Sequence, residues 1–150
     1  MKLRMIALGV VMGTVFLVNS VSAQVRKVPA AVTEAFKSKY PSATNVEWSD
    51  KLTSFMARYE EDNITYEARF NGKGEWLNTE RQLPAEDLPA GVIEGYEKSK
   101  YAEWEMGTVH KIMLPGDKIQ YRVQAIKSDI QRKNLLFSSE GRLLKDNITL

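Results

Sequence analysis

One stretch of this chain occurs twice, and that repetition constrains the fold more than any other feature. Residues 28–40 read VPAAVTEAFKSKY, and residues 88–101 read LPAGVIEGYEKSKY. The shared pattern is P-A-x-V-x-E-x-[FY], and both copies end in KSKY. Short segments of alternating polarity follow each copy. We therefore predict a tandem duplication of one helix-plus-sheet unit.

Each copy is predicted to be an amphipathic helix. The first, from about Pro29 to Tyr40, has one apolar stripe with four-residue spacing: Val28, Val32, Phe36 and Tyr40. The second, from about Pro89 to Tyr101, presents Leu88, Val92, Ile93 and Tyr96. Such spacing places the apolar side chains on one side of a helix. Gly91 and Gly95 each cost up to about 1 kcal/mol of helix propensity, so packing must hold the second helix.

Period-two alternation predicts four short strands behind each helix. In the first unit they cover residues 45–49, 54–60, 64–70 and 75–82, and in the second 104–113, 118–126, 132–137 and 142–148. The turns at 61–63, 71–74 and 115–117 are rich in Gly, Asn and Asp, which close hairpins and so indicate antiparallel pairing. The expected fold class is α+β, with two tandem repeats, each one helix on an antiparallel sheet of about four strands.

The expected domain organisation has three parts. Residues 1–23 are predicted to be a secretory signal peptide, with a basic start at Lys2 and Arg4, an apolar run and cleavage after Ala23. A retained membrane anchor is the alternative, but the apolar run is shorter than the ~20 residues of a spanning helix. Residues 24–150 then form one domain of two repeats, 28–83 and 88–150, joined by LPAED at 83–87. Whether the two sheets join edge to edge is left open.

Composition limits compartment and partners. The sequence has no cysteine, so neither disulfides nor a lipid attachment site at the cleavage position is available. We therefore expect a soluble protein of a Gram-negative periplasm, or one secreted into the medium. Without Lys2 and Arg4 the chain has 19 basic and 19 acidic residues, interspersed with no basic block. That balance argues against nucleic acid as a partner.

The sequence resembles a known family. Two copies of a [VL]-P-x-x-V-x-E-x-[FY] helix follow a leader, each leads to a strand with Glu47-Trp48 or Trp104-Glu105, and a G-x-[WL]-L strand comes later. This combination resembles the PepSY-like, beta-lactamase-inhibitor-like periplasmic proteins of Gram-negative bacteria. The resemblance covers about residues 28–150 and implies a fold like that of beta-lactamase inhibitory proteins. It implies no catalytic residues, and fold alone does not specify function.

No catalytic, cofactor or metal site is expected. His110 is the only histidine, no nucleophile motif accompanies it, and it reads as a strand-surface residue. Residues 60–63 are rich in carboxylates but lack the spacing and the glycine of a calcium loop. Residues 71–74 contain glycines and a lysine but lead into a strand, unlike a phosphate loop. Both are interpreted as hairpin turns.

The two alternation phases of the strands differ in chemistry. The aromatic phase contains Trp48, Tyr59, Tyr66, Phe70, Trp76, Trp104, Tyr121 and Phe137. We expect it to pack under the helices; the alternative is a set of exposed aromatic anchors for a partner. The polar phase contains Glu47, Arg58, Glu67, Arg69, Arg122 and Gln124. It is either a solvated face with cross-strand charge pairs or a recognition surface.

The sequence predicts a non-enzymatic binding protein that needs no cofactor. Its expected partner is a protein or peptide of the cell envelope, recognised by the sheet surface. Two alternatives stay open: inhibition of an exported protease or beta-lactamase, and carriage of a small ligand. An inhibitor needs a protruding loop, and the turns at 71–74 and 115–117 look too short. No individual binding residue can be assigned from the sequence.

Overall fold

The computed structural model describes residues 26–146, in which one helix and four strands occur twice. The first unit contains α1 (Ala30–Lys39), β1 (Thr44–Asp50), β2 (Phe55–Glu61), β3 (Ile64–Phe70) and β4 (Trp76–Leu83). The second contains α2 (Ala90–Glu97), β5 (Glu105–Leu114), β6 (Lys118–Ser128), β7 (Gln131–Ser138) and β8 (Leu143–Lys145). The short 3-10 helix η1 (Ala85–Asp87) joins them. The predicted α+β fold is confirmed.

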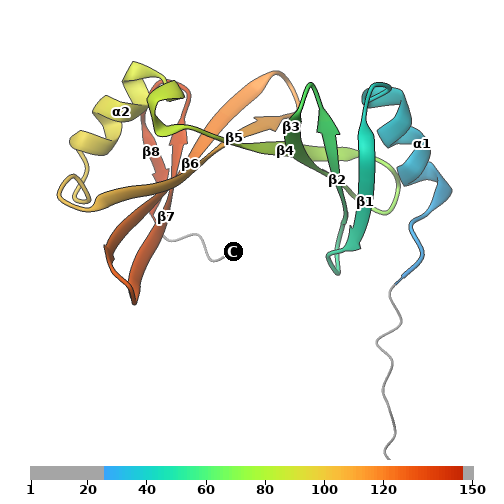
Figure 1. Cartoon of the computed structure of the whole chain (residues 1–150), viewed down its shortest axis with the longest axis horizontal. Coiled ribbons are helices and arrows are strands. Elements are labelled where there is room, and N and C mark those ends of the chain that lie inside the picture. Colours follow the sequence, from blue (N-terminus) through green and yellow to red (C-terminus); the bar gives the residue numbers. More distant parts are fainter. Residues whose placement is uncertain (1–25, 147–150) are drawn as a thin grey trace, which may run out of the picture.

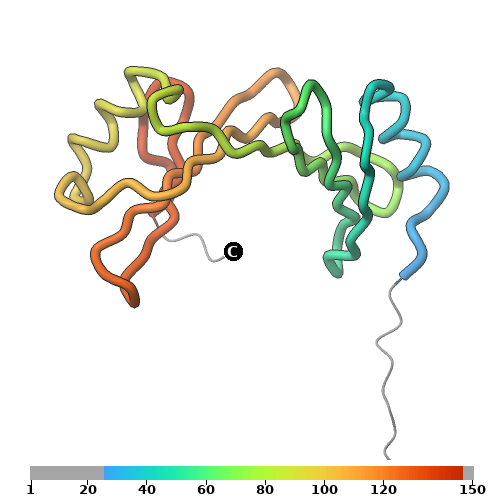
Figure 2. Tube along the Cα trace, in the orientation of Figure 1, coloured from blue at the N-terminus to red at the C-terminus, as the bar shows by residue number. Residues whose placement is uncertain are grey.

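The two units share one sheet. All eight strands pair in sequence order, and every neighbouring pair is antiparallel. The junction is the ladder between β4 and β5, which runs from Thr79–Met113 to Leu83–Val109. The sheet arches, and α1 and α2 lie outside the arch at its opposite ends (Figure 1). The chain crosses from one half to the other through β4 (Figure 2).

The core of the first unit is built around the aromatic ring of Phe36. Val32 and Phe36 are the buried residues of α1, as the four-residue stripe predicts. The Phe36 ring meets Trp48, Tyr59 and Phe70 edge-on, with ring centroids 5.3, 5.2 and 6.2 Å away. Such aromatic pairs contribute about 0.5–1.5 kcal/mol each beyond their buried area. The helix ends at Lys39, and the next N–H, that of Tyr40, still donates to the Phe36 carbonyl.

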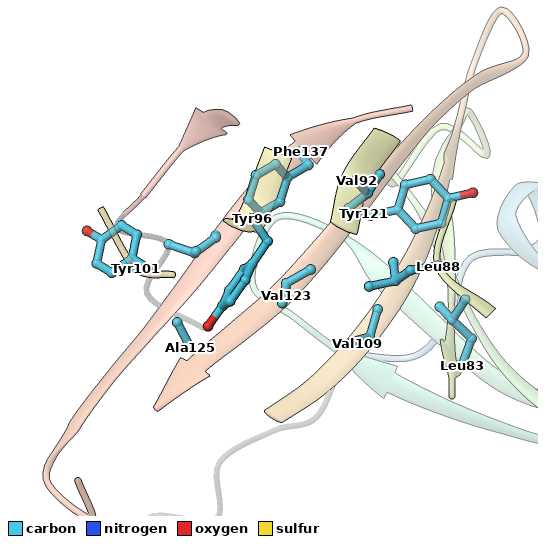
Figure 3. Close-up of a cluster of buried hydrophobic side chains, with 11 residues drawn as sticks. Leu83, Leu88, Val92, Tyr96, Tyr101, Val109, Tyr121, Val123, Ala125 and Phe137 are labelled. Carbon is cyan, nitrogen blue, oxygen red and sulfur yellow. The ribbon is translucent and has the colours of Figure 1, made fainter. Parts of the chain in front are cut away.

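The core of the second unit repeats this arrangement with more aliphatic side chains. Val92 and Tyr96 of α2 face Val123 and Phe137 of the strands (Figure 3). The Tyr96 hydroxyl donates to the carbonyl of Trp104 at 2.8 Å, which satisfies its polar end inside an apolar cluster. Each helix thus covers its own half of the sheet.

The end of α2 corrects the sequence-based expectation. The helix was predicted to reach Tyr101, but it ends at Glu97. The Ser99 hydroxyl donates to the Tyr96 carbonyl at 2.7 Å and accepts from the Tyr101 N–H at 3.1 Å. Serine side chains that bond to nearby backbone in this way compete with helix continuation. The resulting turn directs Tyr101 back into the core, where it is buried.

The glycines of α2 are required by close backbone contact. A Cβ at Gly95 would lie 2.0 Å from the carbonyl oxygen of Gly141, in the turn between β7 and β8. In the first unit, a Cβ at Gly74 would lie 2.6 Å from the carbonyl oxygen of Ala31. Gly74 and Gly141 both have positive φ, +86° and +89°. The last hairpin of each unit therefore packs backbone against helix, which confirms that packing holds α2.

Two predictions extend beyond this region. The signal peptide predicted at 1–23 lies outside the described residues, and so does Ile148, the predicted end of the last strand. Strand β8 ends earlier than predicted, at Lys145, since Asp146 is described and is not part of the strand. Within residues 26–146, no helix has the length and apolar character that a membrane crossing requires. The ends of the remaining predicted helices and strands agree with the structure to within one or two residues.

Candidate binding surface

We call the side of the sheet turned away from both helices the open face. Strand register places all six predicted polar-phase residues on it: Glu47, Arg58, Glu67, Arg69, Arg122 and Gln124. Every predicted aromatic-phase residue instead belongs to, or packs against, one of the two cores on the helix side. The alternative of exposed aromatic anchors on the sheet is therefore wrong. Any recognition by the open face must be mainly polar.

A row of charges crosses the first half of the open face. Glu47 lies opposite Arg58, Arg58 opposite Glu67, and Glu67 opposite Glu80 in successive ladders. Glu80 could not be assigned to this face from the sequence, because polarity alternates only weakly along β4. The irregular pairing at Arg69/Phe70, where Phe70 meets Trp76, shifts the phase of β4. A bulge of this kind cannot be read from polarity alone.

A fork in the sheet creates a hollow on the open face. The β3–β4 ladder ends at Glu67–Glu80, and beyond it β3 continues to pair with β2 while β4 continues with β5. The hollow has a volume of about 810 Å³. Its lining comes from both sides of the fork: Arg58, Asn63, Ile64, Thr65, Glu67, Arg69, Glu80, Arg81, Gln82, Pro84, His110 and Arg122.

An ion pair forms part of the floor of this hollow. Arg122 of β6 donates from Nη2 to Oε2 of Glu80 on β4, and the two side chains are only 12% and 8% exposed. Burying two charges costs several kcal/mol per ion, which their mutual attraction repays only when the geometry is good. A buried ion pair is therefore weak support for a stabilising role. It also links β4 to β6 across β5.

The other arginines of the hollow have no carboxylate partner. Within residues 26–146, no carboxylate lies at ion-pair distance from Arg58, Arg69 or Arg81. The Nε of Arg69 is buried and has no hydrogen-bond partner there, and the same holds for Oδ1 of Asn78, the residue opposite it in the ladder. With four arginines and two glutamates, the lining has an excess of two positive charges.

His110 lies at the edge of this charge cluster. It is half-buried on β5, opposite Gln82 on one side and Arg122 on the other. Burial lowers the pKa of His110 below its ordinary value, and Arg122 adds to the lowering. Glu80 and Glu67 act in the opposite direction. Near neutral pH this environment favours the uncharged imidazole.

Comparison with known proteins gives the family. The model of the family described as "Putative beta-lactamase-inhibitor-like, PepSY-like" matches residues 53–145, more than half of the 150-residue chain. The chain belongs to this PepSY-like family. A search of curated proteins found no match.

Solved structures of similar proteins show the same fold. A "BLIP-like protein" from Bacteroides fragilis NCTC 9343 is 27% identical, with 81% of this chain and 86% of that chain covered and a TM-score of 0.70. A "DUF2874 family protein" from Bacteroides ovatus ATCC 8483 is 24% identical, with coverage of 81% and 88% and a TM-score of 0.74. A chain described among "putative periplasmic proteins" from Bacteroides eggerthii DSM 20697 is 21% identical, with coverage of 81% and 89% and a TM-score of 0.72.

The two turns of the PepSY-like chain that the sequence offered as candidate ion or phosphate sites are hairpin turns. No group of three or more His, Cys, Asp and Glu side chains within residues 26–146 could hold a metal ion. The carboxylates at 60–63 lie at the β2–β3 turn, where Asp62 and Asn63 have positive φ. Residues 71–74 form the turn before β4. Both predicted hairpin turns are confirmed.

Proposed function

We propose that this PepSY-like chain is an exported, non-enzymatic binding protein that recognises an envelope protein or peptide-like ligand through its open face. One observation carries the proposal. The hollow in the open face holds the guanidinium groups of Arg58 and Arg69, which have no carboxylate partner within residues 26–146, beside a buried Glu80–Arg122 pair. Buried and incompletely paired polar groups lower the free energy of unfolding, so their retention in the hollow supports a role other than stability.

Apolar and polar side chains lie on different faces of the sheet, which supports a stabilising role for the helix side and a binding role for the open face. The aromatic and aliphatic cores lie between the sheet and the two helices, and they account for the stability of both halves. The open face receives no helix from the described part of the chain (Figure 1). Sites for drug-like small molecules are usually concave and mainly apolar. The hollow is concave but mainly polar, which favours a charged or polar segment of a partner over a small apolar ligand.

Export is part of the proposal. The apolar N-terminal run ending at Ala23 has the form of a signal peptide. The description of the Bacteroides eggerthii relative as periplasmic supports the same compartment. The mature protein would then begin at Gln24, two residues before Arg26, whose guanidinium binds the Asp50 carboxylate at the end of β1.

Site-specific photo-crosslinking in the producing cells tests the proposal. A benzophenone amino acid replaces Gln82, an exposed open-face residue that lines the hollow, and Glu34, an exposed residue of α1, is the matched control position. We expect the Gln82 probe to form one dominant adduct that the Glu34 probe does not form. Equal adducts from both positions, or none from Gln82, would contradict binding through the open face.

The identity of the crosslinked molecule separates the proposal from its two alternatives. A protease or beta-lactamase whose activity falls in the presence of the purified chain would establish inhibition. The tight turns at 71–74 and 115–117 do not favour that alternative, because neither forms a long loop. A thermal shift with a metabolite, together with no protein adduct, would instead indicate a small-ligand carrier.

A further inference from the structure

We propose that the fork between β3 and β4 binds an extended acidic segment of a protein, with its carboxylates on Arg58 and Arg69. This inference rests on the proposed function and specifies the chemistry of the partner. Three features support it: the charge of the hollow, the unpaired strand edges beside it, and the two glutamates in its lining.

The charge of the hollow selects an anionic partner. Four arginines oppose two glutamates in its lining, although the chain beyond the predicted leader has equal numbers of acidic and basic residues. Glu80 is already paired with Arg122. Of the three arginines of the hollow without a carboxylate partner within residues 26–146, Arg58 and Arg69 lie on the open face, whereas strand register places Arg81 on the helix side of β4. A planar guanidinium binds a carboxylate through two parallel hydrogen bonds, which adds direction as well as attraction.

The strand edges in the fork select a peptide over another anion. Residues 64–66 of β3 have no partners on the β4 side, and residues 81–83 of β4 have none on the β3 side. Unpaired strand edges bind extended chains by main-chain hydrogen bonds, while neighbouring side chains provide specificity. Thr65 and Gln82, both exposed, flank this opening and offer further polar contacts.

The floor of the hollow argues against polyphosphates and sulfated glycans. Glu67 and Glu80 place two carboxylates among the arginines, and these repel a ligand that is anionic at every unit. A peptide with carboxylates at alternate positions can place them on Arg58 and Arg69 and direct its N–H groups toward Glu67. The apolar rim residues Ile64 and Pro84 suit the aliphatic parts of such a segment.

A displayed library of random dodecapeptides, selected on the mature chain, is the first test. We expect selected peptides to be enriched in Asp and Glu relative to the input. The enrichment should disappear with Arg58→Gln/Arg69→Gln and persist with Lys118→Gln/Arg132→Gln, which also removes two positive charges, from exposed positions of β6 and β7 outside the hollow. Binders without acidic enrichment, or no binders at all, would overturn the inference.

Titration of one selected peptide supplies the second test. Its dissociation constant should rise at least about tenfold with Arg58→Gln/Arg69→Gln, and the Nε–Hε NMR signals of both arginines should move on binding to the original chain. Inorganic polyphosphate is titrated in parallel, and binding as tight as that of the peptide would overturn the peptide assignment. If the double variant does not fold, Arg58→Gln alone is decisive, because Arg58 is exposed.

The two proposals fail in different ways. If the Gln82 probe forms no specific adduct, the proposed function itself is contradicted. If the adduct forms equally in the original chain and in Arg58→Gln/Arg69→Gln, binding through the open face stands and only the acidic-segment inference is wrong.

Discussion

Glu67 lies directly opposite Glu80 in the β3–β4 ladder, so two carboxylates face each other on the open face. Like charges directly opposite in a strand pair are destabilising. Arg122 binds Glu80, but Glu67 has no ion-pair partner within residues 26–146. The fold therefore retains two facing carboxylates at the point where the sheet divides.

Replacing Glu67 should stabilise the protein. Glu67→Gln removes the repulsion with Glu80 and keeps the side-chain size, so we expect the free energy of unfolding to rise by about 0.2–1 kcal/mol. Urea unfolding measures the change. Glu34→Gln, on the exposed side of α1, is the control and should have a smaller effect. A loss of stability in Glu67→Gln would mean that Arg58 compensates Glu67 in solution.

Removing one partner of the buried ion pair should lower the free energy of unfolding strongly, and removing the second partner as well should restore most of it. Arg122→Met leaves the Glu80 carboxylate buried without its partner, which should lower the free energy of unfolding by about 3–5 kcal/mol. Adding Glu80→Gln removes the unpaired buried charge, so the double variant should regain most of the lost free energy of unfolding. The comparison is made by urea unfolding of both variants. A double variant as unstable as Arg122→Met would show that packing by Arg122, and not charge, dominates.

The contact between α2 and the last turn should tolerate no side chain. Gly141 has φ +89°, and a Cβ there would lie 1.8 Å from the Gly91 carbonyl oxygen. Gly116 has φ +75° and nothing within 4 Å. The positive φ costs each alanine variant about 1–2 kcal/mol. Gly141→Ala should lose at least about 2 kcal/mol more than Gly116→Ala, because backbone must move. Equal thermal destabilisation of the two variants would refute this contact.

The sequence was sufficient to predict the parts of the fold that depend on local periodicity. The stripe of Val32 and Phe36 and the alternation along β2, β3 and β6 each concern one element, so polarity alone reveals which side is buried. The duplication predicted the second unit from the first. The side of the sheet that packs under the helices was predicted from the aromatic residues that alternate along the strands.

The site could be predicted only in part, because it depends on pairing between strands. Arg58, Glu67, Arg69 and Arg122 were assigned to one phase, but nothing local indicates that β3 and β4 separate after Glu67. The joining of β4 to β5 brings Arg122 to Glu80, which lies 42 positions earlier in the chain. Such contacts depend on register, which one bulge can change.

Part of the loss of stability at low pH should come from the ion pair between Arg26 and Asp50 of β1. The Arg26 guanidinium lowers the pKa of Asp50 to about 2. Because this value lies below that of the unfolded chain, about 3.9, the pair's contribution is complete above pH 4 and is lost as pH falls toward 2. Asp50→Asn should therefore weaken the pH dependence of unfolding between pH 4 and 2. Asp117→Asn, in the exposed β5–β6 turn, should leave it intact.

The pKa of His110, the single histidine, depends on the charges of the hollow. Burial and Arg122 lower the pKa of His110, whereas Glu80 and Glu67 raise it. Glu67→Gln removes one raising charge, so the pKa of His110 should fall further. NMR titration of the untagged chain measures it without ambiguity, because His110 is the only histidine. Glu34→Gln, remote on α1, should leave the His110 titration unchanged.

The lowered pKa of His110 also determines whether the protein gains or loses stability as the pH falls from neutral. Since the folded pKa of His110 lies below that of the unfolded chain, about 6.5, the unfolded state binds its proton first. The contribution of His110 is therefore complete above pH 6.5 and is lost as pH falls through its folded pKa. His110→Asn should flatten the unfolding free energy across this range. If the original chain instead gained stability on acidification from pH 7 to 5.5, and His110→Asn lost that gain, the imidazole would be charged in the fold. The charges of Glu80 and Glu67 would then outweigh burial and Arg122.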